Sequence, residues 1–152
     1  YYTRNDGLQW THVAGNGLGG ELRSLAVHPT DVHVVAAGTA NGLYLSRNAG
    51  QDFEPLVAGS QVLGAAFDLS GRSLWFGTYA GKAVLMRLAL DVGAKPQSVP
   101  IPALMDDGIA YIAQNPARRN EVAFATFKRN VFMSSDQGRN WKQIAREGVT
   151  HE

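Results

Sequence analysis

Short apolar runs, rich in β-branched and aromatic residues, alternate with turn-forming residues along the whole chain. Glycine, proline, asparagine and aspartate separate these runs at intervals of about 8–12 positions, a spacing typical of strands joined by tight turns. No segment shows a sustained helical period. Some runs are apolar at every position, as expected for strands covered on both faces. The pattern therefore predicts an all-β protein of antiparallel strands.

The apolar runs recur as a unit with the same internal order. Pro29 and Pro116 occupy the same turn in two of these units and are 87 positions apart. A period of about 44 residues with four strands is typical of a β-propeller blade. The matching runs are 22–27, 32–37 and 43–45 in one unit and 109–113, 121–126 and 130–133 in the last.

A short motif, called the box below, follows the third strand of a unit. It consists of serine or threonine, a small polar residue two positions later, a glycine and then an aromatic residue. Its copies at 3–10, 46–53 and 134–141 start 43 and then 88 positions apart. We expect the small polar side chain to accept backbone hydrogen bonds, the glycine to allow a left-handed turn, and the ring to be buried between sheets. These residues are Asn5, Gly7 and Trp10, Asn48, Gly50 and Phe53, and Asp136, Gly138 and Trp141.

The remaining unit keeps three strands, at 62–68, 73–78 and 83–85, but lacks a box at 86–93. A proline-containing stretch at 96–102 replaces a clean fourth strand there, so we expect an irregular outer edge. Residues 1–11 are expected to supply the last two strands of another blade. The single propeller segment predicted for 1–152 therefore has about three and a half blades. Its blade parts are 1–13, 22–57, 62–101 and 108–145.

A closed ring needs at least about four blades and commonly has six or seven. An open ring leaves strand edges bare, which native proteins avoid. We therefore expect either a partial ring, as the C-terminal part of a six- to seven-bladed propeller, or open edges covered by another chain. The chain starts at Tyr1 with no basic-then-apolar leader, so a processed or truncated product is also expected.

Composition narrows the classes of partner and chemistry. Of the 152 residues, 45% are hydrophobic and 18% are charged, which suits one domain with a packed core. The net charge is +1, so the protein as a whole has no strong positive potential that would attract nucleic acid. No apolar run approaches the roughly 20 residues of a membrane helix. Because the chain has no cysteine, disulfides, thiolate metal sites and cysteine nucleophiles are excluded.

The last box reads Ser-x-Asp-x-Gly-x-x-Trp and resembles the Asp-box, or bacterial neuraminidase repeat. Over essentially its whole length the chain resembles Asp-box propellers. These include sialidases, sortilin-type receptors, a photosystem II assembly factor and exported bacterial propellers described loosely as glycosyl-hydrolase-like; 111–148 looks most like the C-terminal end of the exported group. The resemblance implies boxes on blade hairpins away from the family's active sites, and an exported (periplasmic or extracellular) protein. It implies no single activity.

Candidate catalytic residues are few. The resemblance to sialidases implies a site with three arginines, a general acid and a tyrosine–glutamate pair. Arg23, Arg72 and Arg119 are present, but nothing in the sequence ties them to a common channel. Tyr44 and Tyr111 fall within apolar runs, where we expect them to pack in the core.

Other candidate acids and metal ligands also lack partners. A glycosidase needs two carboxyl groups about 5–9.5 Å apart, and we expect the adjacent Asp106 and Asp107 to be only a solvated turn. Asp136 has no neighbouring carboxylates and makes a poor calcium site. His28 and His33 lack further ligands for zinc. We therefore expect no catalytic residue, no metal and no cofactor.

Binding is expected on the face formed by loops between second and third strands and by loops between blades. These loops are 38–41, 77–82, 126–130, 15–21 and 103–108. Two tips combine aromatic and basic residues, the composition of interface anchors on a rigid scaffold. The alternative is an ordinary charged loop tip. The candidate partner-binding residues are Tyr79, Lys82, Asp106, Asp107, Phe127, Lys128 and Arg129.

These observations favour a non-catalytic protein-interaction scaffold, or an accessory or assembly subunit. Its partner would be another protein or the remaining propeller blades. The alternative function is a carbohydrate-binding module, or part of a sialidase-like glycoside hydrolase whose remaining site residues lie in missing blades. In that case the ligand would be a glycan.

Overall fold

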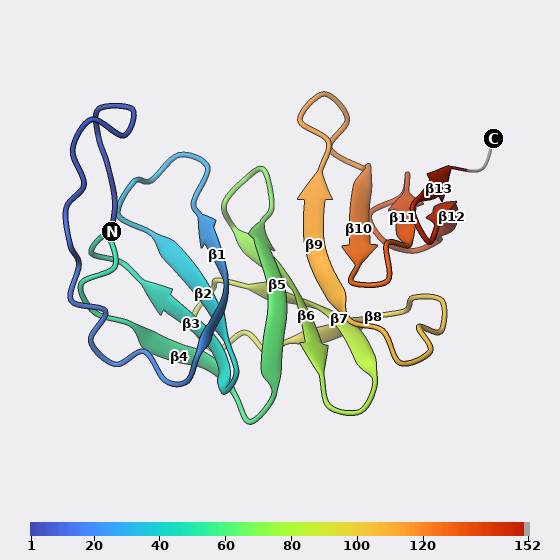
Figure 1. The fold of residues 1–152 in the computed structure, drawn as a ribbon, viewed down its shortest axis with the longest axis horizontal. Helices are drawn as coiled ribbons and strands as arrows, with labels where there is room; N and C mark the ends of the chain where they lie inside the picture. The colour runs from blue at the N-terminus through green and yellow to red at the C-terminus, as the bar shows by residue number, and fades with distance from the viewer. Residues whose placement is uncertain (151–152) are drawn as a thin grey trace.

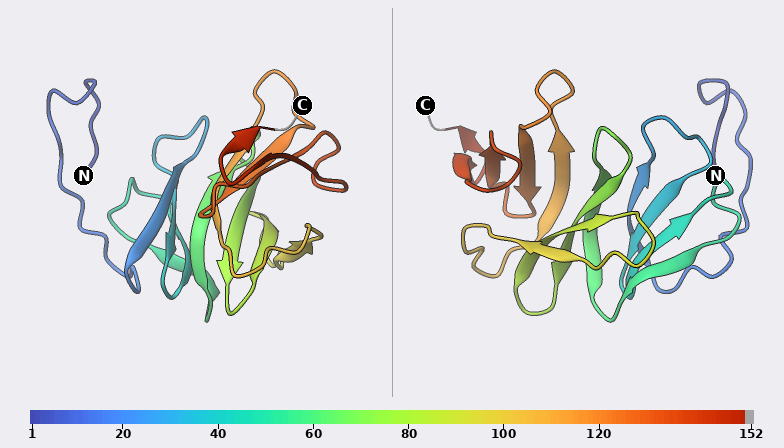
Figure 2. Two further views of the ribbon diagram at one scale, coloured as in Figure 1. Left: turned by 45° about the vertical axis from the view of Figure 1, so that its right-hand side comes forward. Right: turned by 180° about the vertical axis from the view of Figure 1, so that it is seen from behind.

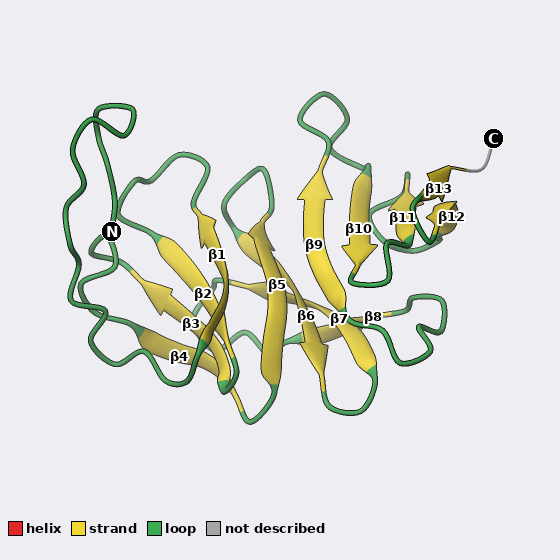
Figure 3. Ribbon diagram, viewed as in Figure 1, coloured by secondary structure: helices red, strands yellow, loops and turns green. Residues whose placement is uncertain are grey.

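The structure, a computed structural model, describes residues 1–150 and contains strands and loops but no helix in that range (Figure 3). The strands form three antiparallel sheets in which each strand pairs with the next one along the chain. The sheets stand side by side, with their first strands β1, β5 and β9 adjacent (Figure 1). This arrangement confirms the prediction of successive all-β propeller blades.

The strand bounds follow the repeat. The first sheet contains β1 (Leu22–Val27), β2 (Val35–Thr39), β3 (Gly42–Ser46) and β4 (Glu54–Ala58). The second contains β5 (Gln61–Phe67), β6 (Ser73–Tyr79), β7 (Ala83–Ala89) and β8 (Gln97–Val99). The third contains β9 (Ile109–Gln114), β10 (Val122–Thr126), β11 (Val131–Ser134), β12 (Lys142–Arg146) and β13 (Val149–Thr150).

Two apolar cores join the sheets face to face. Leu43 of the first sheet and Phe76 of the second are fully buried in one core, which lies between these sheets. Trp75 and Leu85 of the second sheet pack with Phe124 of the third in the other core. Burial of such side chains is the main favourable term that holds blade to blade.

The innermost strands approach each other closely at Gly64 of β5. A Cβ atom at this position would lie 2.7 Å from the carbonyl oxygen of Ala110 on β9. This separation is shorter than any ordinary contact, so glycine allows the two strands to pack backbone against backbone.

All three boxes form the expected turn. The oxygen Oδ1 of Asn5, Asn48 and Asp136 accepts a 2.9 Å hydrogen bond from the backbone N–H four positions later. The serine or threonine hydroxyl also accepts a hydrogen bond from the box glycine N–H, at 2.8–3.0 Å. The glycines have φ of 86–87°, and the residue before each also has positive φ. As predicted, the second and third boxes join the third and fourth strands of their sheets.

The first box departs from the prediction in its surroundings. Residues 1–12 form a hairpin that extends away from the sheets, closed by an isolated bridge between Tyr2 and Thr11 rather than by two strands (Figure 2). Trp10 is 61% exposed, so the prediction that its ring is buried was wrong. Phe53 and Trp141 are partly buried, and Trp141 packs edge-on against Phe124 at 4.8 Å.

Several strand boundaries also differ from the prediction, among them the end of β7, which continues to Ala89 rather than ending at position 85. β2 begins at Val35 rather than at position 32, because Asp31 accepts hydrogen bonds from the backbone N–H groups of His33 and Val34 and holds them in a turn. The irregular stretch at 96–102 still supplies a fourth strand, β8, of three residues. The last sheet extends beyond position 145, because β13 pairs with β12 after a turn at Glu147 and Gly148.

Candidate functional site

Five of the seven candidate partner-binding residues line one shallow hollow of about 330 Å³, called the rim hollow below. It lies where the β6–β7 and β10–β11 turns meet the loop that enters β9. This grouping of turns from two blades with the loop between them is the face expected from the sequence. The lining residues are Gln61, Leu63, Tyr79, Asp106, Asp107, Gly108, Phe127 and Lys128.

Asp107 holds this rim together and is not the solvated residue that the sequence suggested. It is only 5% exposed, whereas Asp106 beside it is exposed. Its oxygen Oδ1 accepts hydrogen bonds from the backbone N–H groups of Gly108 at 2.9 Å and Lys128 at 3.1 Å. Its Oδ2 accepts a 3.2 Å hydrogen bond from the side-chain amide of Asn130. The carboxylate therefore ties the loop before β9 to the β10–β11 turn.

The same contacts set the ionisation of Asp107. Burial opposes the charged form, but the hydrogen bonds received by the carboxylate outweigh burial and lower its pKa. The donors are the side chains of Thr126 and Asn130 and the backbone N–H groups of Lys128 and Gly108. A carboxyl group that is held ionised in this way is poorly suited to act as a general acid. Its role in the rim is structural.

Phe127 connects the rim hollow to a larger one. Its side chain is 61% exposed and also lines an inner-strand hollow of about 440 Å³, which runs over β1, β5 and β9. Arg129 lies in this second hollow, and Lys82 lines neither of them. The residues of the inner-strand hollow are Arg23, Ser24, Leu25, Leu63, Ala65, Ala110, Tyr111, Ile112, Thr126, Phe127 and Arg129.

Tyr111 is an exposed residue of the inner-strand hollow that the sequence analysis did not single out. It was expected in the core, but its side chain is 75% exposed on β9 and lines the inner-strand hollow. Tyr44 is 8% exposed and is buried as expected. Alternation along β9, in which Tyr111 and Ala113 share the exposed face, is the signal that could have identified it.

The three arginines considered for a sialidase-like clamp do not meet in one hollow. Arg23 lies in the inner-strand hollow, and its guanidinium is 3.0 Å from the carboxylate of Glu21. Arg72 and Arg119 each line a different hollow at the opposite end of the sheets. Within residues 1–150, no group of three or more histidine, aspartate and glutamate side chains is placed to hold a metal ion. That range also contains no helix long and apolar enough to span a membrane.

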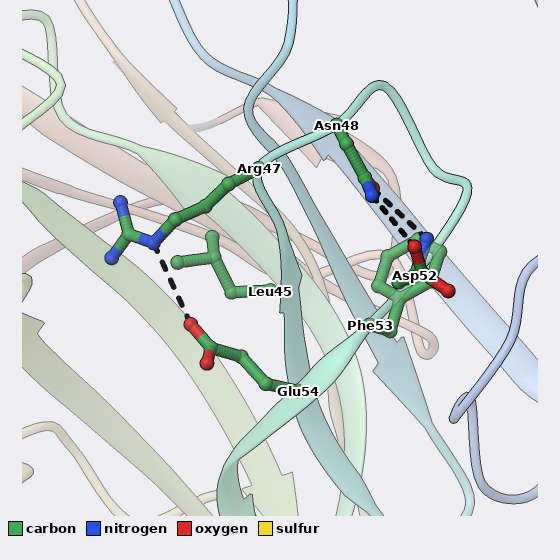
Figure 4. Close-up of a pocket in the computed structure, with 6 residues that line it drawn as sticks. All are labelled: Leu45, Arg47, Asn48, Asp52, Phe53 and Glu54. Carbon is green, nitrogen blue, oxygen red and sulfur yellow. Dashed lines mark hydrogen bonds and ion pairs between the residues drawn. The ribbon is translucent and has the colours of Figure 1, made fainter.

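A further hollow of about 270 Å³ lies at the second box (Figure 4). Its polar side chains are paired with one another. The guanidinium of Arg47 lies 3.5 Å from the carboxylate of Glu54, and the Asn48 amide donates a 2.7 Å hydrogen bond to Asp52. Hydrogen bonds from Asn16 and Asn48 lower the pKa of Asp52. The contact between Asn48 and Asp52 belongs to the box turn itself, and Asn16 joins it with a hydrogen bond to Asp52.

Comparison with known proteins identifies the fold. No family model and no curated protein matches the sequence. Among solved structures, an ancestral GH74 enzyme has a TM-score of 0.67 and 18% identity, covering 82% of this chain and 18% of that one. A structure of YCF48 bound to D1 peptide has a TM-score of 0.66 and 15% identity, covering 86% and 42%. An extracellular domain from B. thetaiotaomicron has a TM-score of 0.63 and 16% identity, covering 90% and 17%.

These identities show the fold alone. The chain spans less than half the length of each of these three neighbours. One neighbour is an enzyme and another is bound to a peptide, so the shared fold accommodates both kinds of protein. What the matches establish is that the three sheets are β-propeller blades.

Proposed function

We propose that this chain is a non-catalytic scaffold or accessory subunit, whose rim hollow and inner-strand hollow together dock a segment of a protein partner. The observation that carries the proposal is the meeting of Tyr79, Phe127 and Lys128 around one hollow that Asp107 holds in place. A binding surface fixed before the partner arrives loses less conformational entropy on association. The neighbour bound to a peptide supports a peptide ligand on this fold.

The chemistry of the surface favours a peptide with an apolar side chain beside an acidic one. Phe127 offers exposed aromatic area at the junction of the two hollows. Lys128 and Arg129 lie next to it, and neither forms an ion pair within residues 1–150. Lys128 shares the rim hollow with the exposed carboxylate of Asp106, so the attraction for an acidic side chain comes mainly from Arg129 in the inner-strand hollow. An aromatic ring flanked by cations can bury an apolar side chain and attract a carboxylate.

A selection from a displayed random-peptide library tests this function. Peptides that bind the wild-type chain should bind the double variant Phe127→Ala with Arg129→Ala at least about tenfold more weakly. The matched control is Arg4→Ala with Leu8→Ala, which also removes one arginine and one exposed apolar side chain, but in the 1–12 hairpin. Unchanged peptide binding by the first variant, or an equal loss of binding in the control, would show that this surface is not the binding site.

A second candidate function is glycan binding at Tyr111. Tyr111 is exposed in the same hollow as Arg23 and Arg129, and a sugar ring can stack on its aromatic face. The GH74 neighbour supports this alternative. A glycan array distinguishes the two functions, since sugar binding should fall with Tyr111→Ala and persist with Tyr79→Ala, which changes only the rim hollow.

We also propose that the protein acts outside the cytoplasm. The support is the similarity to an extracellular domain from B. thetaiotaomicron. Fractionation of the source cells, with detection of the chain by antibody, tests the location. Recovery only with cytoplasmic markers would contradict it.

A further inference from the structure

A separate hollow of about 140 Å³ lies between the second and third sheets, at the end of the strands opposite the rim hollow. It is lined by the turn after β5, by Arg87 of β7 and by residues of the turn after β9. The β6–β7 and β10–β11 turns of the rim follow the second strand of a blade, whereas the turns after β5 and β9 follow the first strand. We call this feature the seam hollow because it spans the junction of two blades.

Hydrogen bonds across the junction hold the walls of the seam hollow. The backbone N–H of Leu69 donates a 2.8 Å hydrogen bond to the side-chain oxygen of Gln114 in the next blade. The Gln114 amide in turn donates to the backbone carbonyl of Arg119. The turn that carries Arg119 is therefore fixed against the neighbouring blade.

The seam hollow has an excess of positive charge. Its ionisable residues are Asp68, Arg87 and Arg119, which together carry one negative and two positive charges. The carboxylate of Asp68 is already engaged by hydrogen bonds from the hydroxyl groups of Ser70 and Ser73 at 2.9–3.0 Å. Arg87 forms a long ion pair with it through Nη2, at 3.8 Å, and its Nε donates a 3.2 Å hydrogen bond to the hydroxyl of Ser73. Arg119 forms no ion pair within residues 1–150.

The second observation that points to a ligand is a buried hydrogen-bond donor without an acceptor. Trp75 lines the seam hollow and is 2% exposed, and its indole N–H has no hydrogen-bond partner among the described residues. The guanidinium of Arg87 lies over the Trp75 ring at 5.1 Å. Leaving a buried N–H without an acceptor costs free energy, so an acceptor group is expected beside it.

We propose that the seam hollow binds a carboxylate group through the indole N–H of Trp75 and the guanidinium groups of Arg87 and Arg119. A carboxylate supplies two acceptor oxygens in one plane, which matches the donor fork of a guanidinium. The site lies at the opposite end of the blades from the rim hollow, so it is independent of the proposed peptide docking.

Nuclear magnetic resonance of the indole N–H groups tests the site directly, because the chain has only three tryptophans. Sodium acetate is titrated into the full chain at constant ionic strength, with sodium chloride as the reference salt. The Trp75 signal should shift with saturation in acetate, and Arg119→Gln should raise the dissociation constant about tenfold. Arg118→Gln is the matched control, because Arg118 pairs with Glu121 at 2.9 Å and does not line the hollow.

Several outcomes would overturn the proposal. These are a Trp75 signal that does not saturate, one that responds equally to chloride, or one that responds to acetate in Arg119→Gln as it does in the wild type. A short peptide with a free carboxyl end, compared with its amidated form, identifies the source of the carboxylate. If the free peptide binds more tightly than acetate, the ligand is the carboxyl end of a polypeptide chain. If the two bind equally, the ligand is a small carboxylic acid.

Discussion

The carboxylate of Asp107 and the backbone N–H of Lys128 are joined by a 3.1 Å hydrogen bond that links two loops from different parts of the third sheet. The ammonium group of Lys128 completes the connection by donating a 3.2 Å hydrogen bond to the carbonyl of Met105. The buried carboxylate of Asp107 thus fixes the turn that carries Phe127 and Lys128.

Replacing Asp107 should weaken the fold. Asp107→Asn removes the charge and turns an amide donor toward the side chain of Asn130, so we expect the free energy of unfolding to fall by about 1–2 kcal/mol. Urea denaturation measures the change. Asp106→Asn is the control, since this exposed neighbour should change stability by less than about 0.5 kcal/mol. Equal effects of the two substitutions would contradict the role of Asp107.

Acid should act on the fold partly through Asp136. The side-chain and backbone hydrogen bonds from Asn140, with that from Ser134, lower its pKa from 3.8 to about 2. A folded-state pKa below the unfolded value favours the ionised folded form, so the stabilisation is present above pH 3.8 and is lost as the pH falls toward 2. Asn occupies this position in the other boxes, and Asp136→Asn should therefore fold.

Thermal unfolding between pH 5 and pH 2 tests this linkage. The difference in melting temperature between the wild type and Asp136→Asn should shrink as the pH falls through this window. Parallel curves for the two proteins would show that Asp136 does not contribute to the pH dependence.

The aromatic residues of the first and last boxes should differ in their contribution to stability. Trp141 packs against Phe124, and its indole N–H donates a 3.1 Å hydrogen bond to the carbonyl of Gly138. Trp141→Ala should cost about 2–4 kcal/mol in the free energy of unfolding. Trp10→Ala, in the exposed hairpin, should cost less than about 0.5 kcal/mol. A large effect of Trp10→Ala in the isolated chain would place its ring in a packed environment.

Gly64 should tolerate no side chain. Gly64→Ala forces β5 away from the carbonyl of Ala110, and we expect a loss of at least about 2 kcal/mol, measured by urea denaturation. Gly93→Ala meets no neighbouring atom within 4 Å and carries only the strain of its positive φ, about 1 kcal/mol. If Gly64→Ala costs no more than Gly93→Ala, the inner strands can separate without penalty.

The repeat predicted the sheets well because it reflects local chemistry. Tight turns such as those at Pro29 and Pro116 depend on nearby residues, so the order of strands is readable from the sequence alone. β2 was placed three residues too early, because the apolar Val32 continues the strand pattern although a turn fixed by Asp31 exposes it. Local patterns do not reveal which side chain will end a strand by accepting a backbone hydrogen bond.

The candidate site could be predicted only in part from the sequence, for a different reason. The loops were located correctly, and five candidate residues do share a hollow, because propeller topology places these loops on one face. The burial of Asp107 and the exposure of Tyr111 depend on how neighbouring sheets pack, which strand period alone does not determine. Whether a partner uses this surface stays a prediction.

The box at 3–10 closes with the same hydrogen bonds as the other two, although its hairpin extends away from the sheets. The box turn therefore closes through hydrogen bonds among its own residues and needs no neighbouring strand for them. The second sheet shows the converse, because it keeps its four strands although the box is missing at 86–93.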